Sequence, residues 1–368
     1  MLFDLRPKTR REDLYDREEE LGEFQNAVNL GENLILLLGI RRLGKSSLLN
    51  VALSESRMPY AKIDVRSLYF THGSIPQEIL AQKILSSLLS TTKPHKSLLL
   101  RFEKTLASLR GLRISGLSVE FDRKPDLAEI LEKISSWAEN ENLRTIIAFD
   151  EAQYLRLSGI RYDGLIAYAV DNLPGITFVL TGSEVGMLHD FLGLEDPKKP
   201  LFGRYAREIV LQRFRREESA DFLRRGFEEV GIKANEKEIT EAIERLDGIV
   251  GWLTLYGYLR AVRHLSHADA MEELFNMAEK LIREELSSLI NNSRRYGVIL
   301  KAVAMGNTRW STIKEYVEFK MGPVNDAKFS LLLKNLLKYG YLEKRDNEYT
   351  IPDPVVNEVV KNLQLTPR

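Results

Sequence analysis

The chain has 368 residues, which is too long for one ordinary domain and predicts two or three. Its 53 basic and 53 acidic side chains cancel, so no global field draws it to nucleic acid or to an anionic membrane. The absence of cysteine excludes disulfides, thiolate zinc sites and cysteine nucleophiles. No apolar run is long enough to span a membrane, and no export signal is visible, so we expect a cytoplasmic protein that does not bind membranes.

The first half of the chain predicts a parallel sheet. A helical pattern covers residues 16–28. Five apolar runs follow, at 34–38, 60–65, 145–149, 176–181 and 208–211. Helical stretches separate these runs, and continuous apolar strands that alternate with helices are typical of a parallel sheet covered on both faces. Residues 112–121 alternate partly with a period of two, which predicts a small added hairpin or edge strand.

The second half is helical. Runs at 217–230, 236–246 and 251–265 predict a small helical unit, and residues 269–291 predict a long connecting helix. Residues 294–362 contain three helical runs and then two short strands around a polar turn, which together predict a winged helix. We therefore expect an α/β domain at 1–215, the helical unit with its connecting helix at 216–292 and a winged-helix domain at 293–368.

Residues 39–46, Gly-Ile-Arg-Arg-Leu-Gly-Lys-Ser, fit the phosphate-binding pattern G-x-x-x-x-G-K-[ST] between an apolar strand and a helix. The glycines let the loop wrap so that N–H groups point inward, and the helix N-terminus adds its positive dipole end. We expect Lys45 to reach the β- and γ-phosphates and the Ser46 hydroxyl to bind Mg²⁺. A chance match in a glycine turn is the alternative, and the flanking strand and helix count against it. The expected phosphate-binding set is Gly39, Arg41, Arg42, Leu43, Gly44, Lys45, Ser46 and Ser47.

Two acids, Asp150 and Glu151, end the apolar run at 145–149. Ligands of open α/β sheets bind beyond the carboxyl ends of the strands, so both acids should face the phosphates. We expect Asp150 to hold Mg²⁺ through water, as a Walker B acid does, and Glu151 to polarise the attacking water as a general base. A solvated pair of acids after a buried strand is the alternative. The paired glutamate and the extra strand at 60–65 fit a class of NTPases, and the absence of an N/T-K-x-D motif for guanine favours adenine.

Three weaker signals surround these motifs. Thr181 and Ser183 stand at the end of the fourth strand, where either hydroxyl could sense the γ-phosphate, and the alternative is a strand end that caps the next helix. Arg204 lies just before the fifth strand and either reaches the γ-phosphate as a catalytic residue or forms a surface salt bridge. Arg41 and Arg42, inside the phosphate loop, are solvent-exposed, or contact phosphate or a partner subunit.

These motifs resemble the archaeal ATPase family of P-loop NTPases, relatives of the STAND and AAA+ switches and of archaeal origin-recognition proteins. The matching pieces span nearly the whole chain and lie at 14–21, 39–49, 149–153, 180–184, 201–204, 248–253 and 349–354. The resemblance implies that Arg17 and Glu18 lie near adenine and that residues 217–265 form a lid over the nucleotide. The chain departs from its relatives at Val250, where they commonly carry a proline that is expected to pack on the adenine.

We therefore expect a P-loop NTPase domain with a helical lid and a winged helix, acting as an Mg²⁺-dependent ATPase that binds ATP and ADP. ATP should hold the lid closed and hydrolysis should release it. One alternative is a DNA-binding regulator in which the nucleotide is only a structural ligand. Another is a small-molecule phosphotransferase, although Glu151 argues against it because a kinase must keep activated water out.

The winged helix carries a local positive charge. Between residues 294 and 348, eleven Lys and Arg stand against six Asp and Glu, a net charge of +5. The basic residues of the expected recognition helix and wing are Lys328, Lys334, Lys338, Lys344 and Arg345. They predict contacts with the phosphates of double-stranded DNA. Three acids crowd the same wing, so a protein partner or a homo-oligomer is the alternative.

Overall fold

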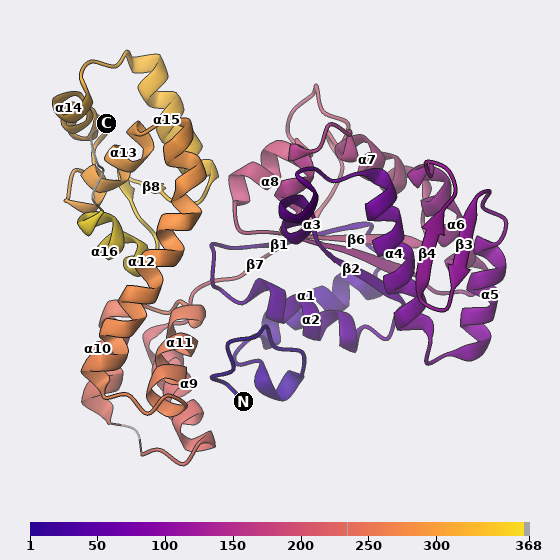
Figure 1. The fold of residues 1–368 in the computed structure, drawn as a ribbon, viewed down its shortest axis with the longest axis horizontal. Helices are drawn as coiled ribbons and strands as arrows, with labels where there is room; N and C mark the ends of the chain where they lie inside the picture. Colours follow the sequence, from indigo (N-terminus) through magenta and orange to yellow (C-terminus); the bar gives the residue numbers. More distant parts are fainter. Residues whose placement is uncertain (234, 364–368) are drawn as a thin grey trace.

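A five-stranded parallel sheet forms the centre of the N-terminal lobe in the computed structural model, which describes residues 1–233 and 235–363 (Figure 1). Its strand order is β2-β5-β6-β1-β7. The strands are β1 (Leu34–Leu38), β2 (Tyr60–Asp64), β5 (Thr145–Asp150), β6 (Ile176–Gly182) and β7 (Arg207–Val210). The five apolar runs are thus confirmed as strands of one parallel sheet, each end lying within one residue of its predicted place.

Helices cover both faces of this sheet. Alternate residues of β1 point to opposite faces, so Ile35 and Leu37 pack with α1 and α2, while Leu34 and Leu36 pack with α4, α6 and α7 (Figure 1). The helices of this lobe are η1 (Arg11–Asp13), α1 (Glu18–Asn29), α2 (Lys45–Glu55), α3 (Val65–His72), α4 (Gln77–Thr92), α5 (Lys96–Leu106), α6 (Leu127–Asn140), η2 (Ala152–Leu157), α7 (Tyr162–Asn172) and α8 (Val185–Leu192). No helix among the described residues has both the length and the hydrophobicity needed to cross a membrane.

The segment at 112–121 forms a separate antiparallel hairpin of β3 (Leu112–Ser115) and β4 (Ser118–Phe121). Of the two predicted forms, the hairpin is therefore the one adopted, and it does not extend the parallel sheet.

The C-terminal lobe contains the helical unit and the winged helix. Its elements are α9 (Arg216–Glu229), α10 (Glu236–Leu246), α11 (Val250–Ala261), α12 (His267–Asn292), α13 (Arg295–Ala304), α14 (Trp310–Met321), α15 (Asp326–Lys338), β8 (Glu343–Arg345), β9 (Glu348–Thr350) and α16 (Pro354–Asn362). The long helix α12 runs from the helical unit to the winged helix along the side that faces the sheet (Figure 1). The winged helix is confirmed, and the domain boundaries at 215/216 and 292/293, which fall between elements, stay a prediction.

Helix α16 was not predicted. The Asp353 carboxylate caps its first turn by accepting hydrogen bonds from the N–H groups of Val355 and Val356 at 2.9 and 3.2 Å. Pro354 occupies the first turn, where its missing N–H costs nothing. The valines at 355, 356, 359 and 360 are buried, so this Asp-Pro start and apolar spacing were the signal in the sequence.

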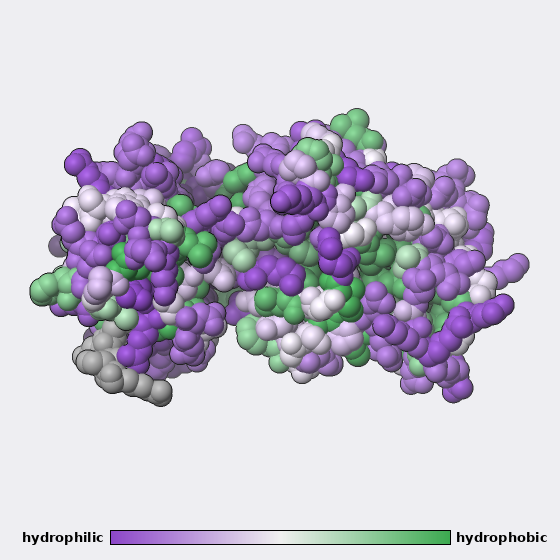
Figure 2. Space-filling model, turned by 90° about the horizontal axis from the view of Figure 1, so that it is seen from above, coloured by the Kyte–Doolittle hydropathy of each residue, from purple (hydrophilic) through white to green (hydrophobic). Residues whose placement is uncertain are grey.

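The two lobes meet at a narrower waist in the view from above (Figure 2). The end of α15 packs closely on α8, because a Cβ at Gly186 would lie 2.7 Å from the Cα of Lys338. Lys338 also forms an ion pair with Asp190 of α8. The N-terminal segment crosses to the helical unit, where the fully buried Phe3 packs edge-on against Phe222 and Phe227.

Candidate nucleotide-binding site

A cavity of about 440 Å³ lies between the two lobes. The phosphate loop lines one side of it, and residues 4–8 of the N-terminal segment line another. Val250, Gly251 and Thr254 of α11 and Glu285 of α12 contribute from the C-terminal lobe. This volume and this position between two structural units are typical of small-molecule sites.

The phosphate loop has the backbone of an anion-binding turn. Gly39 and Gly44 have φ values of 146° and 88°, and Arg42 is left-handed at 69°. The N–H groups of Arg41, Arg42 and Gly44 donate no hydrogen bond to any residue in the described part of the chain. Helix α2 begins directly after the loop, at Lys45, and adds its positive end. The loop thus offers unpaired donors at a helix N-terminus, which is what a phosphate group requires.

Lys45 is held at the mouth of this loop. Its ammonium donates to the carbonyl oxygens of Gly39 and Ile40 at 2.8 and 2.7 Å, and the residue is only 5% exposed. Burial lowers the pKa of Lys45 to about 8, although the neighbouring charge of Glu151 acts in the opposite direction. A phosphate would supply the missing counter-charge.

The two acids at the end of β5 occupy different places. Glu151 lines the cavity, and its carboxylate accepts hydrogen bonds from Gln153 at 2.5 Å and from Ser183 at 2.6 Å. Asp150 lies buried behind it, where it accepts from the Thr181 hydroxyl at 2.5 Å. Asp150 does not itself line the cavity, and its expected role of holding Mg²⁺ through water stays a prediction. Ser183 donates to Glu151, whereas α8 begins without a side-chain cap.

Ser46 and Asp150 carry oxygen atoms of the kind that bind magnesium. Ser46 lines the cavity, and Asp150 supplies a carboxylate whose other oxygen lies 3.4 Å from the ammonium of Lys62. Hydroxyl and carboxylate oxygens are the ligands that Mg²⁺ prefers, usually together with waters and substrate phosphates. Within residues 1–233 and 235–363, no group of three or more His, Asp or Glu side chains could hold a metal by itself. An ion here would therefore depend on the nucleotide.

Arg17 and Glu18, expected near adenine, differ in position. Arg17 is buried, lines the cavity and donates to the carbonyl oxygen of Gln212 at 2.9 Å, with its guanidinium 4.7 Å from the ring centre of Phe214. Glu18 starts α1, is exposed and lies 3.9 Å from the guanidinium of Arg11. It does not line the cavity, and its place near adenine stays a prediction.

Arg204 is also outside the cavity. Its guanidinium donates to both carboxylate oxygens of Asp171 on α7, at 2.8 and 2.6 Å. This two-bond geometry satisfies the planar guanidinium on the surface. The prediction that Arg204 reaches the γ-phosphate within its own chain is therefore wrong, and the predicted alternative of a surface salt bridge is what forms.

Several cavity residues were missed. Tyr15, Phe214 and Phe222 supply aromatic surface to the cavity, and Arg66 at the start of α3 also lines it. The strand register was a signal for Arg66. Asp64, the last residue of β2, pairs with Asp150 of β5, so the chain just after it must reach the same edge of the sheet.

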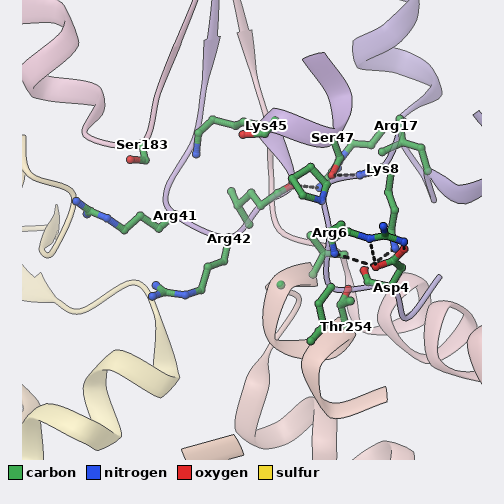
Figure 3. Close-up of a pocket in the computed structure, with 18 of the residues that line it drawn as sticks. Asp4, Arg6, Lys8, Arg17, Arg41, Arg42, Lys45, Ser47, Ser183 and Thr254 are labelled. Carbon is green, nitrogen blue, oxygen red and sulfur yellow. Dashed lines mark hydrogen bonds and ion pairs between the residues drawn. The ribbon is translucent and has the colours of Figure 1, made fainter. Parts of the chain in front are cut away.

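Arg41 and Arg42 are not solvent-exposed. Their side chains are 19% and 13% exposed. In Figure 3 both point away from Ser47 and Lys8, toward the C-terminal lobe of the same chain. Solvent exposure, one of their three predicted alternatives, is therefore wrong.

Comparisons with known proteins agree with this geometry. Residues 14–255 match the family model described as an ATPase domain predominantly from Archaea, and residues 291–352 match the C-terminal winged helix-turn-helix domain of MCM proteins. No protein with a curated description matches the sequence.

The chain resembles solved structures over nearly its whole length. The Walker-type ATPase PABY2304 of Pyrococcus abyssi is 42% identical with a TM-score of 0.86, over 98% of this chain and 100% of that one. The ORC2 protein of Aeropyrum pernix, solved as ADPNP–ADP complexes, is 15% identical with a TM-score of 0.60, over 98% of this chain and 96% of that one. The likeness to ORC2 concerns the fold alone. By its ATPase-domain match and its identity to PABY2304, the chain belongs to the family of ATPase domains found predominantly in Archaea, and it carries an MCM-type winged helix.

Proposed function

We propose that this protein binds ATP with Mg²⁺ in the cavity between its lobes and hydrolyses it, as a switch of the STAND and AAA+ type. The observation that carries the proposal is that one cavity is lined by the phosphate loop with Lys45, by the acid Glu151 and by the lid residues Val250 and Thr254. A site that joins phosphate donors, a base and a separate lobe suits a nucleotide that controls the contact between lobes.

Each residue has a definite task in this proposal. Lys45 and the free amides of the loop bind the β- and γ-phosphates, and Ser46 and Asp150 hold Mg²⁺, which neutralises charge on the phosphates. Glu151 accepts the proton of the attacking water, and the hydrogen bonds from Ser183 and Gln153 hold its carboxylate at the cavity wall.

Adenine is the base we propose. The ORC2 structure of the same fold contains ADPNP and ADP, both adenine nucleotides. The aromatic side of the cavity, with Tyr15 and Phe214, suits a planar base, and Val250 replaces the proline expected at the lid.

The test is ATP turnover by the full chain. We expect Mg²⁺-dependent release of phosphate by the wild type and a loss of about a hundredfold or more in Glu151→Gln, which keeps the size of the side chain and removes the base. Glu195→Gln, at an exposed glutamate outside the cavity, is the matched control and should keep wild-type turnover. Turnover that persists in Glu151→Gln contradicts the assignment of the base. Turnover that appears only with an added acceptor molecule favours a phosphotransferase.

A DNA-binding role for the winged helix is a second candidate. The match to an MCM winged helix and the exposed Lys328 and Lys334 of α15 support it. Lys338 contributes less, because it is paired with Asp190. A protein partner or a second copy of the chain is the alternative use of this domain.

A further inference from the structure

Two neighbouring arginines of the phosphate loop are bound by carboxylates of the protein itself. Arg42 donates to Glu285 of α12 at 2.8 Å, and Arg41 donates to Glu184 at 2.7 Å while its Nε lies 3.9 Å from Glu285. Glu285 therefore stands beside both guanidinium groups. Carboxylate and phosphate oxygens bind a guanidinium in the same planar geometry, so these acids occupy positions that a phosphate could take.

The carboxylate of Glu285 is nearly buried, and the two arginines do not satisfy it fully. Its side chain is 9% exposed, and one of its carboxylate oxygens has no hydrogen-bond partner among the described residues. It also lines the cavity that contains Lys45 and Ser46. A triphosphate in that cavity would face a buried negative charge, and the two anions would compete for the same arginines.

The same arginines connect the loop to the winged helix. Arg41 donates to the carbonyl oxygen of Tyr339 at 3.3 Å, and its guanidinium lies 5.0 Å from the ring centre of Tyr341. Figure 3 shows the side chains of Arg41 and Arg42 extending from the loop toward the winged helix, drawn in yellow. Arg41 therefore contacts both Glu184 and the segment between α15 and β8, so a movement of its guanidinium would disturb both sets of contacts.

Arg42 makes the corresponding connection to the helical unit. Its guanidinium lies 4.4 Å from the ring centre of Trp252 and 3.9 Å from the carboxylate of Asp353. Trp252 in turn donates its indole N–H to Asp353 at 3.0 Å, and the Arg42 carbonyl oxygen accepts from the N–H of Gly251 at 2.9 Å. The arginine pair is thus a joint between the phosphate loop, the lid and the winged helix.

We propose that Glu285 holds the place beside Arg41 and Arg42 that the γ-phosphate of ATP takes, so that ATP, and not ADP, releases the phosphate loop from the C-terminal lobe. This direction is the reverse of the expectation from the sequence, in which ATP holds the lid closed. This inference rests on the proposed function, because it assumes that the cavity binds ATP. The exchange replaces one anion by another at the arginines. It leaves Glu285 without its cations, so the lobe that carries it must move away from the loop. ADP lacks the third phosphate and leaves the ion pairs intact.

The first experiment compares nucleotide affinities by calorimetry in the full chain. Glu285→Gln removes the competing charge, so we expect its ATP affinity to rise about tenfold while its ADP affinity stays within about twofold of wild type. Glu284→Gln, at the exposed neighbouring residue of the same helix, is the matched control and should change neither affinity. An unchanged ATP affinity in Glu285→Gln, or an equal change for ATP and ADP, overturns the inference.

The second experiment does not depend on the folding of that variant. The chain has no cysteine, so fluorophores can be placed at Lys83→Cys of α4 and Lys328→Cys of α15, both exposed. With Glu151→Gln added to keep ATP intact, we expect energy transfer between the labels to change with MgATP and to stay at the nucleotide-free value with MgADP. Equal transfer in all three conditions overturns the inference. If the unlabelled wild type binds no ATP by calorimetry, the proposed function itself fails. The calorimetry thus separates that failure from a failure of the γ-phosphate to replace Glu285 at the arginines.

Discussion

The Ser183 hydroxyl donates a hydrogen bond of 2.6 Å to the carboxylate of Glu151, so that the residues following β6 and β5 meet at the cavity wall. Gln153 donates a second bond to the same oxygen at 2.5 Å, and Glu151 itself has a left-handed backbone with φ of 56°. Three constraints therefore fix the orientation of the proposed base.

Ser183→Ala should slow hydrolysis more than it weakens binding. A hydrogen bond to a charged group is worth about 1.5–3 kcal/mol, so its loss should lower kcat by about tenfold or more if the bond orients the base in the transition state. ADP affinity should stay within about twofold of wild type. Ser287→Ala, at an exposed serine of α12, is the control. Wild-type kcat in Ser183→Ala would mean that this bond has no part in the reaction.

The affinity for ATP should fall at alkaline pH. Burial lowers the pKa of Lys45 to about 8 in the empty site, and phosphate binding favours the ammonium form. As the pH rises through about 8, the empty site loses this proton, so binding must take one up and ATP affinity decreases. Calorimetry near pH 9 in buffers of different ionisation enthalpy measures the uptake directly. Lys45→Arg keeps its charge in this range and should bind without proton uptake.

Arg66, and not Arg204, should matter for hydrolysis within one chain. Arg66 lines the cavity and forms no ion pair with any described residue, whereas Arg204 is bound to Asp171. We expect Arg66→Ala to lower kcat by about tenfold. In dilute samples, Arg204→Ala should leave kcat unchanged. Equal kcat for Arg66→Ala and wild type contradicts this. If turnover rises with protein concentration and Arg204→Ala abolishes that rise, Arg204 acts across a subunit boundary.

Binding of duplex DNA by the winged helix should depend strongly on salt. Several phosphate contacts predict a log–log slope of about −3 to −5, which Lys344→Ala should flatten by about one unit. Lys338→Ala should change the slope less, because Lys338 is already paired with Asp190. Lys124→Ala, at an exposed lysine of the N-terminal lobe, is the control. The absence of binding at low salt, with and without ATP, would favour a protein partner.

The sequence was a good guide wherever the determinant is local. Strand β1 is buried at every residue, so its continuous apolar run identified it directly. The phosphate loop was equally clear, because its function depends on backbone geometry that only glycine at set positions permits.

The contacts between the lobes could not be predicted from such local patterns. Glu285 lies 243 positions from Arg42, and no periodicity in α12 distinguishes it from the exposed Glu284 beside it until the lobes are packed together. The prediction for Arg204 failed for the same reason, because it depended on a contact between residues that are distant in the sequence. Its position before β7 was predicted correctly, but its partner Asp171 lies on α7, 33 residues earlier in the chain.

The most direct test of the central claim is calorimetric titration of wild type and Lys45→Ala with MgATP. The buried ammonium of Lys45 is held inside the phosphate loop, and charge-assisted contacts of this kind are worth a few kcal/mol. We predict a Kd for wild type that rises at least about tenfold in Lys45→Ala. An unchanged Kd in Lys45→Ala, or a wild type that binds no ATP, would contradict the account.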